Sequence, residues 1–140
     1  AKGREYQYLL LNQSINSAIM SHYCGWSFYN LNLDLMKKSL LKFKGKHDFN
    51  AFRSIDCQSS SSIKTIQSCT VKKNKQYIVI NVAAKSFLHS QVRIITGTLV
   101  DVGKGKISPT NIKKIIESKD RSKAGTTAPA HGLYLLKVEY

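Results

Sequence analysis

The chain has 140 residues, 42% of them hydrophobic, which is enough for one domain with an apolar core. Its formal net charge of +14 points to a polyanionic partner, nucleic acid or an anionic membrane surface, and we favour nucleic acid over a general role in solubility. No apolar run is long enough to span a bilayer, and no amino-terminal segment has the pattern of a secretion signal. Three cysteines, Cys24, Cys57 and Cys69, make no disulfide framework, so a cytoplasmic setting is expected.

The first predicted element is a strand over residues 5–12, "EYQYLLLN". Its opening alternates strictly, with Tyr6 and Tyr8 set against Glu5 and Gln7, and this period of two is typical of a half-buried strand. The two tyrosines either stack on nucleic-acid bases or pack into the core, and core is the usual outcome for alternating aromatics.

After a loop, residues 32–45 ("NLDLMKKSLLKFKG") predict a helix. Asn32 is a plausible N-cap, and Gly45 is expected to end the helix. Its apolar stripe consists of Leu33, Met36, Leu40 and Phe43.

A serine run at residues 59–62 is predicted to be a loop, and residues 63–84 predict a β-hairpin. The hairpin strands are rich in β-branched residues, and its polar turn is placed at residues 72–76.

The stretch "SFLHSQVRIITGTLVDVGKG", residues 86–105, predicts a helix with a buried stripe. That stripe is Leu88, Val92, Ile95, Leu99 and Val102. Another face carries Arg93 among small or polar residues and no lysine, which suggests that something approaches this face closely. An arginine in a cleft needs an anionic partner, a carboxylate or a phosphate; the alternative is a side chain that extends to solvent.

The chain ends with a helix at residues 109–118, opened by Pro109, and a strand within "HGLYLLKVEY", residues 131–140. The predicted order is β-α-β-β-α-α-β. This pattern indicates a single α+β domain over residues 1–140, with a mostly antiparallel sheet and the helices packed on one face.

Other local signals are weaker. Gly97, Gly103, Lys104 and Gly105 hint at a phosphate loop, but they follow a helix rather than a strand, and a glycine helix cap is favoured. His22 and Cys24 have metal-ligand chemistry without a completing set, so no metal is expected. Cys57 is a possible nucleophile, although nothing nearby argues for a lowered pKa.

Four motifs in chain order carry a resemblance to a known family: "AKGREYQY", "GKHDFNAF", "FLHSQVRIITGTLVDVGKG" and "KDRSKAGTTAPAHGLYLLKVEY". Together they resemble the carboxy-terminal half of the bacterial tRNA pseudouridine synthase A family, over essentially the whole chain. The resemblance implies an isomerase that converts uridine to pseudouridine in the tRNA anticodon arm, just 3′ of the anticodon. It also implies a homodimer that needs no cofactor or metal.

In that family the nucleophile is an aspartate within an "R-x-D-x-G-V-H" motif, which does not occur in this sequence. The resemblance therefore implies that the amino-terminal half with its catalytic aspartate is absent, and that this chain by itself is inactive. By position, Arg93 matches the arginine that pairs with the aspartate, and Tyr6 matches the tyrosine that stacks on the uracil and is the proposed base. Leu133 matches the apolar wall of the uracil pocket.

The tRNA backbone is expected to follow the basic surface. The candidate phosphate contacts are Lys42, Lys44, Lys46, Lys72, Lys73, Lys75, Lys104 and Lys106. An alternative of a different class stays open, namely a stand-alone basic RNA-binding module without chemistry; a cysteine-dependent RNA enzyme using Cys57 is a minor third.

Overall fold

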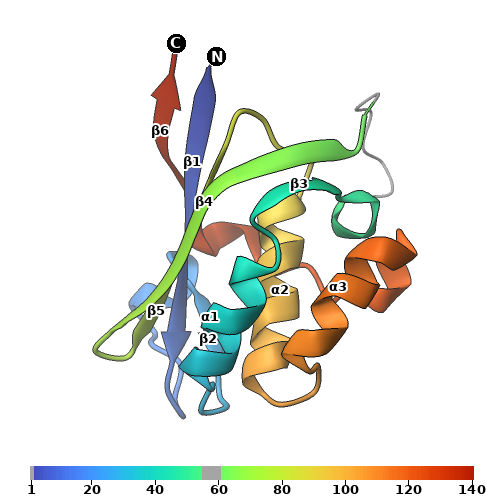
Figure 1. The fold of residues 1–140 in the computed structure, drawn as a ribbon. Coiled ribbons are helices and arrows are strands. Elements are labelled where there is room, and N and C mark those ends of the chain that lie inside the picture. Colours follow the sequence, from blue (N-terminus) through green and yellow to red (C-terminus); the bar gives the residue numbers. More distant parts are fainter. Residues whose placement is uncertain (1, 55–60) are drawn as a thin grey trace.

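The computed structural model describes residues 2–54 and 61–140, and Figure 1 shows its ribbon. The strands in these ranges are β1 Gly3–Asn12, β2 Gly25–Ser27, β3 Gly45–Asp48, β4 Ile63–Asn74, β5 Tyr77–Ala84 and β6 Leu133–Glu139. The α-helices are α1 Leu33–Leu41, α2 Gln91–Gly103 and α3 Pro109–Ser118, and the single 3₁₀ turns are η1 Met20–His22, η2 Asn50–Phe52, η3 Arg121–Lys123 and η4 Ala130–Gly132. The α+β class is confirmed.

All six of these strands belong to one sheet, with the order β2-β1-β5-β4-β3 and with β6 also on β1. One edge of β1 pairs with β5, while its other edge pairs first with β6 and then, at Leu10 to Asn12, with β2. The β1–β2 pairing is parallel and the pairings of β1 with β5 and β6, of β4 with β5 and of β3 with β4 are antiparallel. The sheet of the described residues is thus mostly antiparallel, as predicted.

The helices cover one face of this sheet (Figure 1). Along β5 the buried residues Ile78, Ile80, Val82 and Ala84 alternate with half-exposed ones, which is the pattern of a strand with one face on the core. Helix α2 lies against α1 and reaches β1. It begins at Gln91 and not at residue 86 as predicted, so Leu88 precedes the helix; all five residues of the predicted stripe are nevertheless buried. The interior therefore lies between the helix-facing side of the sheet and the buried faces of α1, α2 and α3.

Helix α1 begins at its predicted capping residue but ends earlier than predicted. Asn32 caps α1, since its side-chain oxygen accepts a hydrogen bond of 3.1 Å from the Leu35 N–H. The helix ends at Leu41, however, and the prediction that it runs to Gly45 is wrong: Gly45 begins β3 instead. Phe43 is still fully buried, because the turn after α1 directs it into the core.

The hairpin is present, with a tighter turn than predicted. Strand β4 continues to Asn74 and pairs there with Tyr77, so that only Lys75 and Gln76 connect the strands. Lys75 adopts a left-handed backbone with φ of 54°, as two-residue hairpin turns require. Helix α3 has the predicted bounds, with Ser108 as its N-cap and Pro109 in its first turn.

Two strands were absent from the predicted order. β2 and β3 have only three and four residues, too few for a period of two to be visible in the sequence. Both exist because they extend the sheet at its edges, next to β1 and β4. Within residues 2–54 and 61–140, no helix has the length and apolar character needed to cross a bilayer.

Candidate functional site

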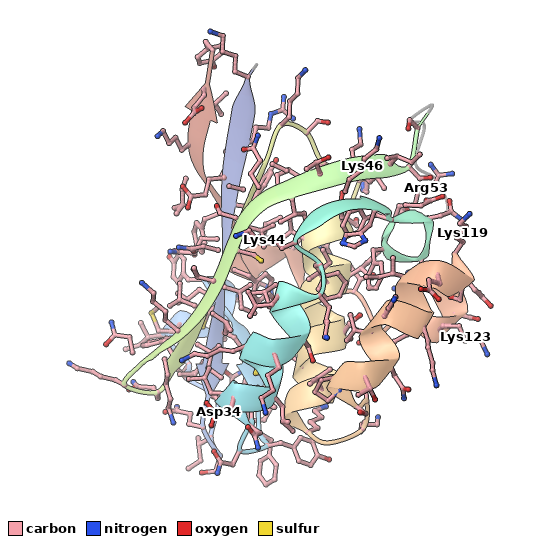
Figure 2. All side chains as sticks on the ribbon, in the orientation of Figure 1. Asp34, Lys44, Lys46, Arg53, Lys119 and Lys123 are labelled. Atoms are coloured by element: carbon pink, nitrogen blue, oxygen red, sulfur yellow. The ribbon has the colours of Figure 1, made fainter. Side chains whose placement is uncertain are left out.

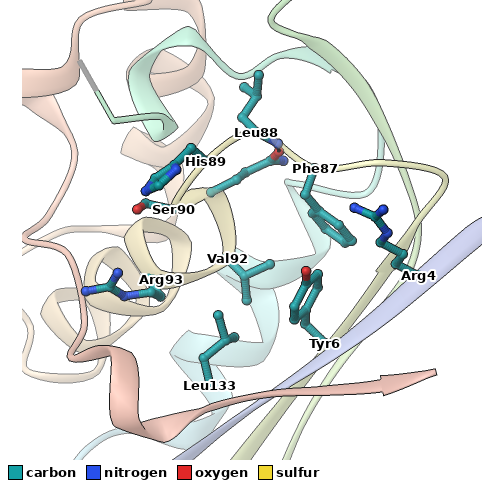
Figure 3. A pocket seen from close by; sticks show the side chains of 10 residues that line it. Arg4, Tyr6, Phe87, Leu88, His89, Ser90, Val92, Arg93 and Leu133 are labelled. Atoms are coloured by element: carbon teal, nitrogen blue, oxygen red, sulfur yellow. Dashed lines mark hydrogen bonds between the residues drawn. The ribbon is translucent and has the colours of Figure 1, made fainter. Parts of the chain in front are cut away.

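A cavity of about 320 Å³ opens at the start of α2, between β1, β6 and the segment that joins β5 to α2. This volume is at the small end of the range for ligand sites. Tyr6, Arg93 and Leu133, which the sequence analysis singled out, all line it although they are far apart in the chain. Figure 3 shows the three with their neighbours, and Arg4 lies at the opposite end of the cavity from Arg93.

Tyr6 reaches the cavity from the middle of β1. Its ring meets the ring of Phe87 edge to face, with centroids 5.2 Å apart and planes at 82°. This geometry is favourable for aromatic pairs and holds the Tyr6 ring in place while leaving it half-exposed. A planar ring fixed at the wall of a cavity can stack on a planar ligand.

Tyr8 lies on the same face of β1 but belongs to the core. Its hydroxyl donates a 2.7 Å hydrogen bond to the carbonyl of Pro129, and the side chain is fully buried. Burial raises the pKa of Tyr8 to about 12, an effect that the nearby Arg93 partly offsets. A Cβ on Gly132 would lie 2.6 Å from the Tyr8 ring, so glycine is required for the ring to pack there. The core interpretation was therefore right for Tyr8, while Tyr6 faces the cavity.

Arg93 sits in the first turn of α2 and is fixed from one side. Its Nε donates to the Ala128 carbonyl at 2.8 Å, and the Ala128 N–H donates to the Arg93 carbonyl at 3.0 Å. Within residues 2–54 and 61–140 it forms no ion pair with a carboxylate, and no acceptor is bound to its two terminal nitrogens. The guanidinium is half-buried, its Nε is held by the Ala128 carbonyl, and its terminal nitrogens are available to an external anion.

The structure shows what approaches the small-residue face of α2: it is the segment from Ala124 to Ala128. A Cβ on Gly97 would lie 1.6 Å from the Thr126 carbonyl oxygen, so only glycine permits this contact. The Gly125 N–H donates to the Thr98 hydroxyl at 2.9 Å, which fixes the segment along the helix. This docking sets the position of the Ala128 carbonyl and, through it, of Arg93.

Arg121 secures the same segment from the other side. Its two terminal nitrogens donate to the Gly125 carbonyl at 2.8 Å and to the Thr127 hydroxyl at 3.1 Å. Just before it, Asp120 caps η3, and hydrogen bonds from the side chain and backbone of Ser122 lower the pKa of its carboxyl group. The loop that orients Arg93 is thus held by hydrogen bonds along most of its length.

Comparison with known proteins shows the family to which the chain belongs. The model of a family described as tRNA pseudouridine synthase matches residues 40–140. The chain belongs to the tRNA pseudouridine synthase family. Arg93 and Leu133 fall within the matched range, and Tyr6 precedes it.

Curated relatives match the entire chain. A tRNA pseudouridine synthase A from Thermoanaerobacter sp. (strain X514) is 44% identical over 140 residues, which are 100% of this chain and 57% of the relative. Its counterpart in Ehrlichia ruminantium (strain Welgevonden) is 46% identical with the same coverage, and that of Colwellia psychrerythraea is 39% identical over 54% of its length. The chain therefore spans a little over half the length of these relatives.

In this member of the tRNA pseudouridine synthase family, the cavity has further lining residues that the sequence analysis did not assign to a site, among them Arg4, Phe87, His89 and Ser90. Arg4 stands two residues before Tyr6 on the same strand, so the alternation of β1 could have placed both on one face. Phe87 and His89 lie in the connection between β5 and α2, and no periodic pattern in the sequence predicts the path of this connection. The His89 carbonyl accepts a hydrogen bond of 3.1 Å from the Ser54 N–H. Ser90 follows with a left-handed φ of 64°.

The weaker candidates are placed away from this cavity. Cys24 is buried with its thiol against the Met20 carbonyl, and burial raises its pKa, which disfavours the reactive thiolate. Among the described residues no group of three or more His, Cys, Asp or Glu side chains could hold a metal ion. Gly105 adopts a φ of 85° at the end of α2, the favoured helix-cap role, and Cys57 lies outside the described residues.

All eight lysines proposed as phosphate contacts are exposed, but they do not form one patch. They lie after α1, on β3, at the β4–β5 turn and after α2, and Lys104 rests 4.7 Å from the Tyr29 ring centre. Figure 2 shows cationic side chains all over the molecule, with Lys46, Arg53 and Lys119 at one end of the view. The positive charge is therefore spread over the surface. Only the position of each lysine relative to the cavity can rank these lysines as candidate phosphate contacts.

Proposed function

We propose that this chain forms one wall of the uridine-binding site of an RNA-modifying isomerase that converts uridine to pseudouridine in the anticodon arm of tRNA. The observation that carries the proposal is the convergence of Tyr6, Arg93 and Leu133 on one cavity, in a chain of the tRNA pseudouridine synthase family. Tyr6 stacks on the uracil, Leu133 gives the apolar wall, and Arg93 binds the nucleophilic carboxylate.

The reaction is an isomerisation and balances without a co-reactant. The bond from uracil N1 to ribose C1′ breaks, the base turns within the site, and a bond from C5 to C1′ forms; the C5 proton leaves and N1 gains one. The target base must leave its stack to reach such a site, and the stacking ring and the apolar wall hold it while it turns.

Tyr6 is also the better of the two tyrosines for removing the C5 proton. The Tyr8 hydroxyl is already committed to the Pro129 carbonyl, and its pKa of about 12 opposes ionisation. The Tyr6 ring is half-exposed in the cavity, where the uracil ring of a nucleotide can reach it.

The carboxylate partner of Arg93 is proposed to come from outside the described residues. An unpaired guanidinium in a cavity gains most from a bidentate carboxylate, and its Nε is already fixed by Ala128. Under this proposal the chain by itself lacks the nucleophile, and the active enzyme is a cytoplasmic homodimer that contains the missing aspartate.

Tritium release from tRNA labelled at uracil C5 tests the proposal. The chain is assayed by itself and after mixing with the remaining segment of the Thermoanaerobacter relative, expressed separately. We expect release only from the mixture, and the variant Arg93→Lys to lower the rate on the order of 100-fold because lysine cannot bind Ala128 and a carboxylate together.

The matched control is Lys113→Gln on the exposed face of α3, which should leave the rate unchanged. Release by the chain alone would place the nucleophile within these residues, and Asp48, Asp56 and Cys57 would then be substituted. Tight tRNA binding without release in any mixture would favour the RNA-binding module instead.

A further inference from the structure

Three cations lie together at one end of the central strands. On β1, Arg4 pairs with Ala84 of β5, and Ala84 in turn pairs with Ile66 of β4. Lys85 directly follows Ala84, and Lys64 stands two residues before Ile66 on the same strand. We call Arg4, Lys64 and Lys85 the rim cations.

This end of the sheet is the mouth of the candidate site. Arg4 lines the cavity beside Phe87 (Figure 3). The Lys64 ammonium group donates a 3.1 Å hydrogen bond to the hydroxyl of Ser86, the residue before Phe87. Lys85 is exposed next to Ser86. Arg4 thus lines the cavity, Lys64 binds the segment that leads into the cavity wall, and Lys85 directly precedes that segment in the chain.

The rim cations are not neutralised by acidic neighbours. Within the ranges 2–54 and 61–140, none of them takes part in an ion pair. Two acidic residues are close in register: Glu139 follows the β6 partner of Arg4, and Asp48 follows the β3 partner of Lys64. Both are already in ion pairs, Glu139 with Lys137 at 3.2 Å and Asp48 with Lys119 at 3.8 Å. Glu5 alternates to the face of β1 opposite Arg4. Unpaired cations around a cavity mouth attract anions more strongly than the same charges on an open surface.

The turn between β4 and β5 offers an internal comparison. Lys72, Lys73 and Lys75 carry the same total charge and are also exposed. Lys73 pairs with Ile78, six residues along β5 from Ala84, which separates the two groups by roughly 20 Å. This second group, the turn cations, lies at the other end of the β4–β5 hairpin from the rim cations, and none of its three lysines lines the cavity.

We propose that the rim cations bind the RNA phosphates that directly flank the nucleotide held in the cavity, and that the turn cations do not. This rests on the proposed function. A base that enters the cavity remains joined to two phosphodiesters, which must cross the cavity mouth. Arg4, Lys64 and Lys85 are the cations that meet them there.

Fluorescence anisotropy of a labelled anticodon stem-loop RNA tests this with the full 140-residue chain. The rim variant carries Arg4→Gln, Lys64→Gln and Lys85→Gln, and the turn variant carries Lys72→Gln, Lys73→Gln and Lys75→Gln. Both lose the same charge from exposed or half-exposed positions, so both should keep the circular dichroism of the wild type.

We expect the rim variant to bind at least about tenfold more weakly, and its slope of log Kd against log salt to fall by about 1.4, since each of the two phosphate contacts to single-stranded RNA contributes about 0.7. The turn variant should keep the wild-type slope. Methylphosphonate linkages at the two flanking phosphates should weaken the wild type but not weaken the rim variant further.

Equal losses in the two variants, or an unchanged rim variant, would overturn the inference, because the charge would then act diffusely. So would flanking methylphosphonates that weaken the rim variant as much as the wild type. A wild-type chain that does not bind this RNA even at low salt would contradict the proposed function rather than the choice of cations.

Discussion

Tyr6 and Tyr8 differ by one alternation along β1, yet their surroundings assign them opposite roles. Tyr6 meets Phe87 at the cavity, whereas Tyr8 is enclosed and bonded to Pro129. The same residue type on the same strand face is therefore exposed to ligand in one case and structural in the other. What separates them is the loop at residues 124–130, which covers the second tyrosine and stops short of the first.

The Tyr8 phenol should make stability depend on alkaline pH. Burial raises its pKa from 10.0 to about 12, so the folded protein holds the phenolic proton more tightly than the unfolded chain. The contribution of this group is fully present below pH 10 and is lost as the pH rises from about 10 to about 12, which lowers the free energy of unfolding by about 3 kcal/mol.

Urea unfolding at a series of alkaline pH values measures this loss. In Tyr8→Phe, the part of the fall in unfolding free energy that comes from the phenol should be missing. The lysines contribute equally in both proteins, so their effect cancels in the difference. If the two proteins lose stability in parallel over this pH range, the Tyr8 phenol does not ionise differently in the folded state.

At the scale of elements, the critical contact is between α2 and the loop that precedes β6. The loop approaches so closely that its Thr126 carbonyl occupies the space of a Gly97 side chain. Arg93 lies one helical turn before Gly97, and its backbone and Nε both bind Ala128 in the same loop. Helix and loop thus form one unit, and the orientation of Arg93 depends on both.

The substitution Gly97→Ala should therefore destabilise the protein. In an exposed helix it would be worth about 1 kcal/mol of stability, but here the added Cβ must displace the backbone of Thr126. We expect a loss of roughly 3 kcal/mol in the free energy of urea unfolding. Asn111→Ala, on the exposed surface of α3, is the matched control and should change stability by less than about 0.5 kcal/mol. A Gly97→Ala protein as stable as the wild type would mean that the loop can move aside freely.

For the molecule as a whole, excess positive charge is the dominant electrostatic feature. The net charge of +14 is what remains after all eight Asp and Glu residues are counted. Among the described residues, ion pairs at exposed or partly exposed positions join Lys113 to Glu117, Lys119 to Asp48 and Lys137 to Glu139. Exposed pairs of this kind contribute little to stability. Repulsion between like charges therefore opposes folding at low ionic strength.

Added salt should raise the melting temperature for this reason. From about 20 mM to about 300 mM sodium chloride we expect a rise of roughly 5 °C, as screening weakens the repulsion. Thermal unfolding followed by circular dichroism measures the rise, and the rim variant, with three fewer charges, should show a smaller one. A melting temperature that falls with salt would mean that the ion pairs outweigh the repulsion.

The sequence by itself determined the elements whose signals are local. The stripe of α2, the N-cap of α1, the bounds of α3 and the existence of the hairpin were all predicted correctly, because helix periodicity, capping and turn chemistry depend on residues a few positions apart. The family resemblance likewise selected Arg93, Tyr6 and Leu133, and the structure places all three at one cavity.

Only the tertiary structure decided which residues surround that trio. The strands β2 and β3, the loop over Gly97, the contribution of Arg4 and Phe87, and the position of Lys64 beside Ser86 all follow from strand register and loop docking. Such contacts join residues tens of positions apart in the chain, and their free energy depends on the packed arrangement rather than on any local period. For this reason, the eight lysines that the sequence analysis proposed as phosphate contacts did not include the rim cations.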